Sequence, residues 1–187
     1  ETDALQISVI SGAINIITTL IAISLIDRVG RKPLLLIGSI GMTLALSTMA
    51  VIFSTAPLKE VAASSTCAAP CMQPVLTGGT AVTALIAANA FVFFFGFSWG
   101  PVVWVLLGEM FPNRIRAIAL SVAAAAQWLA NFVVSTTFPP LASEGLGIAY
   151  GLYAFFAAVS LWFVWRYVKE TKGRTLEEMD STYAAAT

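Results

Sequence analysis

The chain has 187 residues, of which 58% are hydrophobic and 11% are charged, and its formal net charge is +0 at pH 7. Soluble domains carry about 25% charged residues, so this composition excludes an ordinary soluble protein and indicates a membrane protein. There is no histidine, no glycine-rich phosphate loop and no GxSxG or HExxH motif. We therefore expect no enzyme activity, no cofactor and no nucleic-acid partner.

Five apolar stretches are each long enough to cross a bilayer. A hydrocarbon core of roughly 30 Å needs about 20 residues at 1.5 Å each, and a helix satisfies its own backbone polar groups in lipid. The sequence therefore predicts an all-α polytopic membrane fold over residues 1–168, with spans near 6–26, 34–54, 81–111, 117–138 and 148–168. The third stretch is longer than one crossing requires, so we expect its outer end to protrude or tilt.

The distribution of basic residues predicts the orientation, because cytoplasmic loops collect Lys and Arg. Nine of the ten basic residues follow or close the first, third and fifth spans, and only Lys59 falls on the other side. We therefore expect the tail of residues 169–187 to be cytoplasmic, and residue 1 and the loop 56–79 to lie outside. The chain starts at Glu1 without a signal peptide, which favours the C-terminal part of a longer protein over a complete five-span protein.

The outer loop holds both cysteines, Cys67 and Cys71, in a compartment that this orientation makes oxidising. A disulfide between them and a pair of free thiols both remain open. We expect no metal site, because two thiolates without any histidine do not complete a tetrahedral shell. In the tail, Thr175 and Glu178 have the spacing of a capping box, which predicts a short surface helix.

Neutral polar and aromatic side chains occur at membrane depth, namely Asn15, Asn89, Gln127 and Asn131, with Trp104 and Trp128. Gln127 and Asn131 are four residues apart and hence share a helix face, with Trp128 beside them. Amides and aromatic faces suit a neutral polyhydroxyl ligand better than an ion, so we predict a midplane cavity for such a ligand. The alternative is that the amides only join helices and Trp128 only packs.

Two interruptions of the apolar pattern also stand out. In the third span, Gly100–Pro101 removes a backbone hydrogen bond and predicts a kink at membrane depth. After the first span comes the charged hexapeptide DRVGRK at 27–32, in which Asp27 and Arg31 are four residues apart and Gly30 permits a left-handed turn. Membrane anchoring alone is one explanation of this hexapeptide.

Three motifs, in this order, resemble signatures of the sugar porter family of the major facilitator superfamily: DRVGRK at 27–32, GPVVWVLLGEMFP at 100–112 with NRIR following, and KETKGRTLEE at 169–178. The resemblance implies that the chain corresponds to the eighth through twelfth of twelve spans, which is most of the C-terminal six-helix half. SWGPVVWVLLGEMFPNRIR and AAQWLANFVVS resemble bacterial xylose–proton symporters in particular.

By matching position, the resemblance implies roles for single residues. It implies contacts with the sugar for Asn15, Trp104, Gln127 and Trp128, with Asn131 as a further candidate. It also implies a cytoplasmic gate of ion pairs that closes while the site faces outward, formed by Asp27, Arg28, Arg31, Glu109, Arg114 and Arg116. The chain departs from the family at Gly96, where several glucose carriers have a glutamate, and at Lys169, where proline is usual.

The function implied is a secondary transporter in the plasma membrane that moves a monosaccharide, a pentose or a hexose, by alternating access. Symport needs a titratable group within the membrane, and the five spans offer no midplane carboxylate or histidine. A proton carrier would therefore lie in the N-terminal half, which this chain lacks. We expect sugar–proton symport, with a facilitative uniporter as the alternative and with a channel subunit and a membrane scaffold as candidates outside the family.

Overall fold

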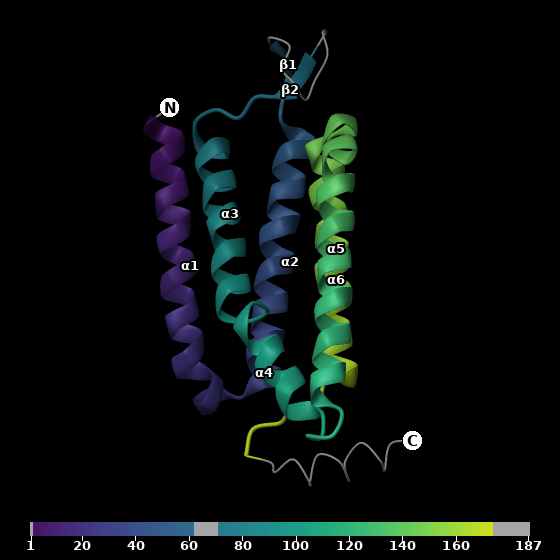
Figure 1. Ribbon diagram of the computed structural model, residues 1–187. Helices are drawn as coiled ribbons and strands as arrows, with labels where there is room; N and C mark the ends of the chain where they lie inside the picture. Colours follow the sequence, from purple (N-terminus) through teal and green to yellow (C-terminus); the bar gives the residue numbers. More distant parts are fainter. Residues whose placement is uncertain (1, 62–70, 174–187) are drawn as a thin grey trace.

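A computed structural model describes residues 2–61 and 71–173 of the chain (Figure 1). This part contains the helices α1 (Thr2–Val29), α2 (Arg31–Thr55), α3 (Gly79–Phe97), α4 (Pro101–Met110), α5 (Arg116–Glu144) and α6 (Leu146–Tyr167), and the strands β1 (Leu58–Val61) and β2 (Cys71–Pro74). Five segments are long and apolar enough to cross a membrane, with α3 and α4 together forming one of them. The predicted all-α, five-span fold is confirmed.

The structure differs from the predicted elements in two places. Residues of the outer loop form a two-stranded antiparallel hairpin, in which Leu58 pairs with Pro74 and Val61 pairs with Cys71. Helix α5 continues six residues past the predicted end at 138 and includes Pro139 and Pro140. Each proline removes the hydrogen bond that a backbone N–H would donate to the carbonyl four residues earlier, at Ser135 and at Thr136, and α5 nevertheless continues for one further turn to Glu144.

Two sequence predictions concern residues outside the described part of the chain. Cys67 and the side chain of Cys71 are not described, so a disulfide between them and a pair of free thiols both stay open. The same holds for the surface helix expected to begin at Thr175.

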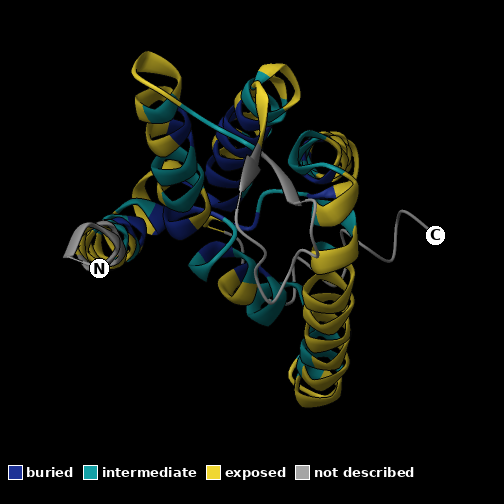
Figure 2. Ribbon diagram, turned by 90° about the horizontal axis from the view of Figure 1, so that it is seen from above, coloured by how far each residue is buried: buried dark blue, intermediate teal, exposed yellow. Residues whose placement is uncertain are grey.

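Helix α2 is the centre of the bundle. It packs most extensively against α6 and α3, while α1 packs mainly against α3, and α5 mainly against α6. Seen from above, α5 is an exposed arm at the edge of the bundle, and none of its residues is buried (Figure 2). The buried core includes Ile26, Leu34, Leu35, Val102 and Val164, from α1, α2, α4 and α6. This core lies where α1 ends and α2 begins, which we call the basal end.

The third span is broken at Ser98–Gly100, as the Gly–Pro pair predicts. The N–H of Gly100 donates to the carbonyl of Phe95 at 3.0 Å, and Pro101 then begins α4, where its missing N–H costs nothing. The side chain of Trp99 fixes this turn against α2, because its Nε1–H donates to Ser39 Oγ at 2.8 Å. Ser39 is fully buried and also accepts a hydrogen bond from Ser160 of α6 at 3.4 Å. The break is therefore held in a defined position.

Glycines bring α2 and α3 close together. A Cβ at Gly38 would overlap the side chain of Ser98, and one at Gly41 would overlap the ring of Phe94. Small residues at helix contacts are the usual way to gain packing between helices in a membrane, where lipid removes the hydrophobic driving force.

We predict that Gly38→Ala destabilises the protein by roughly 1–3 kcal/mol, because the added methyl overpacks the α2–α3 contact. Gly151→Ala in α6 is the matched control, since nothing lies within 4 Å of a Cβ at that position. The control should be neutral or slightly stabilising, because alanine favours helix over glycine. Thermal unfolding of the two purified variants in detergent measures the difference. Equal unfolding midpoints would show that the glycine contact does not limit stability.

Candidate functional site

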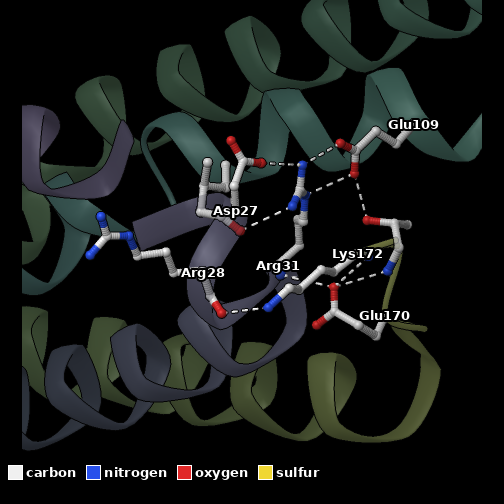
Figure 3. A network of polar contacts seen from close by, with 8 residues as sticks. Asp27, Arg28, Arg31, Glu109, Glu170 and Lys172 are labelled. Carbon is white, nitrogen blue, oxygen red and sulfur yellow. Dashed lines mark hydrogen bonds and ion pairs between the residues drawn. The ribbon is translucent and has the colours of Figure 1, made fainter. Parts of the chain in front are cut away.

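Arg31 is the centre of a polar network at the basal end (Figure 3). It is the first residue of α2, and only 8% of its surface is exposed. Its Nη2–H and Nε–H donate to the two carboxylate oxygens of Glu109, at 2.6 Å and 2.9 Å. A bidentate, charge-assisted pair of this kind is among the strongest polar contacts in proteins. It joins the start of α2 to the end of α4.

Arg31 has two further partners at the end of α1. Its Nη1–H donates to the carbonyl oxygen of Ile26 at 3.0 Å, and its Nη2–H donates to Asp27 at 3.1 Å. The side chain of Asp27 is 79% exposed, whereas that of Glu109 is 33% exposed. An exposed pair contributes about 0–1 kcal/mol, so the Glu109 pair is the stronger of the two. Together these contacts connect α1, α2 and α4.

Glu170, which follows α6, caps the start of α2. The N-cap residue Gly30 has no side chain to do this, and the carboxylate of Glu170 accepts hydrogen bonds from the backbone N–H groups of Arg31 and Lys32, both at 3.0 Å. Gly30 has a φ of 104°, and a Cβ there would lie 2.6 Å from Glu170 Oε2. Glycine is therefore required both for the turn and for the approach of the carboxylate.

The electrostatics of Glu170 follow from these donors. Burial alone would raise the pKa of its carboxyl, but four backbone N–H groups, those of Lys172, Arg31, Lys32 and Thr171, outweigh burial and lower the pKa below its ordinary value. Hydrogen bonds to the charged form of a carboxylate have this effect. The segment after α6 is thus held to α2 by an ionised group.

The same segment also contacts Glu109 and α1. The buried hydroxyl of Thr171 donates to Glu109 Oε2 at 2.6 Å, and Lys172 Nζ donates to the carbonyl oxygen of Arg28. The prediction from the sequence included neither Glu170 nor Thr171 in the gate. Both residues belong to the KETKGRTLEE motif at 169–178, which was the one signal for them in the sequence. Their partners are far away along the chain, and those of Glu170 at the start of α2 are backbone N–H groups, which any residue has.

The structure brings together only some of the six residues predicted to form the gate. Asp27, Arg31 and Glu109 meet, and Arg28 joins through its carbonyl group alone. Arg114 is exposed. Arg116 donates from Nε to the carbonyl oxygen of Phe111 at 3.2 Å, and its buried Nη2 has no hydrogen-bond partner among the described residues.

The predicted ligand-binding residues lie on three helices. Asn15 is on α1, Trp104 is on α4, and α5 carries Gln127, Trp128 and Asn131. All five are exposed, Trp104 by 39% and Trp128 by 74%, and no other described residue forms a hydrogen bond with any of their side chains. Residues 2–61 and 71–173 therefore do not enclose these five side chains in a cavity by themselves.

Two other positions at membrane depth have packing roles. Asn89 of α3 accepts a hydrogen bond from the hydroxyl of Ser11 in α1 at 3.1 Å, so it joins two helices. Gly96 is buried, and a Cβ there would overlap Thr18 Oγ1 of α1. The packing of α1 on α3 therefore leaves no room at this position for the glutamate that several glucose carriers have. Among the described residues, no group of three His, Cys, Asp or Glu side chains could hold a metal ion.

Comparison with known proteins defines the class. The family model "Sugar (and other) transporter" matches residues 1–183. A glucose transport protein of Synechocystis is 58% identical over 96% of this chain, and the D-xylose-proton symporter of Escherichia coli is 38% identical over 98%. The chain spans about a third of the length of these relatives, 36% and 34% respectively.

Solved structures agree with the sequence comparison. The proton:xylose symporter XylE, a major facilitator superfamily protein solved with 6-bromo-6-deoxy-D-glucose, superposes with a TM-score of 0.78 at 38% identity. The match covers 98% of this chain and 36% of XylE. The chain belongs to the sugar transporter family, and its fold is that of a multi-pass membrane protein of the major facilitator superfamily.

The lowered pKa of Glu170 predicts a pH dependence of stability. A carboxyl whose pKa is depressed on folding stabilises the protein fully above its unfolded pKa, here about 4.5, and this contribution is lost as pH falls through the lower folded value. We expect Glu170→Gln to reduce the unfolding midpoint at pH 7 and the difference from the wild type to shrink below about pH 4.5. Midpoints measured between pH 7 and pH 3 test this. Parallel curves would contradict the assignment.

Proposed function

We propose that this chain forms most of the C-terminal six-helix half of a twelve-span secondary transporter that carries a monosaccharide by alternating access. The observation that supports this most directly is the family match over residues 1–183, together with relatives that are named for glucose and xylose transport. A site built between two halves of a transporter is only half present in this chain, which accounts for the exposure of Gln127 and Trp128.

Sugar–proton symport is the favoured energy coupling, and facilitated diffusion is the second candidate. A relative that is a D-xylose-proton symporter supports the first. In the described spans, the carboxylates occur near the ends, as Asp27, Glu109 and Glu144 do, and none is central. Symport therefore requires a proton-carrying group in the N-terminal half, and uptake driven by an imposed pH gradient separates the two candidates.

We place the protein in the plasma membrane, with its basal end on the cytoplasmic side. Arg31, Lys32 and Lys172 gather at that end, whereas Lys59 is in the hairpin at the opposite end of the bundle (Figure 1). The positive-inside rule then assigns the hairpin to the outside.

The proposed gate uses the Arg31–Glu109 pair as a latch. In the closed state the pair and Glu170 tie α1, α2, α4 and the segment after α6 into one unit. Opening toward the cytoplasm separates α4 from α2 and breaks the bidentate contact. Partly buried pairs that break in one state can shift a two-state equilibrium by a few kcal/mol. Trp104 lies in α4 between this latch and the fixed turn at Trp99, so motion of α4 also moves the proposed sugar site.

We predict that Glu109→Gln in the complete transporter shifts the population toward the inward-facing state, because Arg31 loses the stronger of its two charged partners. Sugar should still bind with altered affinity, while net transport falls. Glu144→Gln is the matched control, since Glu144 is an exposed carboxylate at the end of α5, on the hairpin side of the bundle. Distances between spin labels on the two halves report the conformation. If both the distribution of label distances and the rate of transport were unchanged, Glu109 would have no role in the gate.

We predict that Gln127→Ala weakens sugar binding roughly ten- to a hundredfold, because an unpaired buried hydrogen-bonding group costs about 1–3 kcal/mol. The loss should be smaller for a deoxy sugar that lacks the hydroxyl contacted by Gln127. Trp104→Ala should weaken all accepted sugars to a similar extent, and Trp104→Phe should restore part of the binding, as expected for a stacking surface.

Calorimetry on the purified full-length protein measures these affinities. Trp162→Ala, which removes an exposed tryptophan of α6, is the control and should leave binding unchanged. Wild-type affinity in both Gln127→Ala and Trp104→Ala, with the fold intact, would return these residues to a packing role.

A further inference from the structure

The turn at Ser98–Gly100 sets the place and direction in which α4 begins. The backbone N–H groups of Ser98 and Gly100 both donate to the carbonyl of Phe95, at 3.2 Å and 3.0 Å, in place of the regular helical pattern. Figure 1 shows α4 leaving the line of α3 at this point. The ends of helical elements are where a chain changes direction most easily, so a side chain that ties this turn to a neighbouring helix controls the position of α4.

Trp99 provides that tie. Its ring packs against the apolar core, and its indole N–H donates to Ser39 Oγ of α2 at 2.8 Å. A buried indole N–H usually has a hydrogen-bond partner, because leaving it unpaired costs free energy. Loss of the acceptor at Ser39 would therefore favour a shift of Trp99 and of the turn that carries it.

Ser39 is itself held in place by α2 and α6. Its side chain is fully buried, and its Oγ accepts a hydrogen bond from Ser160 of α6 at 3.4 Å. One turn further along α2, the hydroxyl of Thr43 donates to the backbone carbonyl of Ser39 at 2.7 Å. The contact between α2 and α6 is the most extensive in the bundle. The acceptor for Trp99 is thus positioned by two helices that do not belong to the broken span.

Helix α4 carries the position of the turn to Trp104. This residue lies in the first turn of the helix, which begins at Pro101, and it is five residues beyond Trp99. Val102 and Leu106 are buried in the core, whereas Trp104 is 39% exposed. At 3.6 residues per turn, Trp104 lies on the side of α4 opposite to these two residues. A shift of the first turn of α4 therefore displaces the ring of Trp104.

We propose that Ser39 is a positioning residue for the sugar site. By accepting the hydrogen bond of Trp99, it holds the start of α4 where the ring of Trp104 can stack on the sugar. Ser39 is fully buried, so it acts through Trp99 and α4 and does not touch the sugar. Stacking depends on the placement of the ring, so a small displacement lowers affinity. The inference rests on the proposed function, because it requires that Trp104 contact sugar.

The test introduces Ser39→Ala into the full-length transporter, both alone and together with Trp104→Ala. Calorimetry measures the affinity for D-glucose or D-xylose, whichever binds the wild type more tightly. We expect Ser39→Ala alone to weaken binding about fivefold, the ratio that loss of one hydrogen bond of about 1 kcal/mol gives. In the Trp104→Ala background it should have no further effect, because no ring is left to position.

Two further variants complete the experiment. Trp99→Phe removes the donor of the same hydrogen bond and keeps an aromatic ring, so it should reproduce the loss of affinity even if Ser39→Ala folds poorly. Thr43→Val is the matched control, because it removes a hydroxyl of α2 that bonds within its own helix. This control should bind sugar as the wild type does.

The possible results separate this inference from the proposed function. If Ser39→Ala weakened binding by the same factor with and without Trp104, Ser39 would be a general packing residue and the proposal would be overturned. Wild-type affinity in Ser39→Ala and Trp99→Phe, with weakened binding in Trp104→Ala, would also contradict it, but would leave the proposed function intact. If Trp104→Ala itself bound sugar as tightly as the wild type, the proposed sugar site would fail, and this inference with it.

Discussion

The buried contact between Arg31 and Glu109 determines how the described helices meet. A guanidinium group that is almost fully buried needs a charged partner, since an unpaired charge in the same position is strongly destabilising. Glu109 is that partner, and it fixes the end of α4 against the start of α2 at 2.6 Å. Because Asp27 and Glu170 hold the same turn, the end of α1, the start of α2, the end of α4 and the segment after α6 share one junction. Separation of the end of α4 from the start of α2 would break this contact.

The rest of the bundle limits where such motion can occur. Trp99 and Ser39 hold the turn before α4, and close glycine contacts lock α3 against α2. Helix α4 is therefore a ten-residue segment held at both ends. The hydrogen bond of Trp99 holds its start, and the ion pair of Glu109 holds its end. The hydrogen bond between Trp99 and Ser39 joins two neutral groups, so a change of charge does not break it. The contact between Arg31 and Glu109 is an ion pair, so its strength depends on both charges. Under the proposed function, this asymmetry favours the basal end as the part that opens.

Much of the fold could be predicted from the sequence, because a span depends on length and apolarity alone. The break at Gly100–Pro101 and the pairing of Asp27 with Arg31 are also local, so their causes lie within a few residues. The pairing of Arg31 with Glu109 required a resemblance to known transporters, since nothing in the spacing indicates it. The role of Glu170 was not predicted, because its partners at the start of α2 are backbone N–H groups, which no side-chain pattern in the sequence marks. Gln127 and Trp104 are exposed in the described part of the chain, so their proposed role in sugar binding stays a prediction.

A double-mutant cycle on Arg31 and Glu109 tests the central claim most directly. Arg31→Gln, Glu109→Gln and the combined variant of the full-length transporter are compared for free energy of unfolding in detergent at pH 7. If the pair is the latch, the two single changes are strongly non-additive, with a coupling energy of about 1–3 kcal/mol. The double variant then loses little more stability than either single variant. Additive effects, with a coupling close to zero, would contradict the account and leave the basal junction to apolar packing.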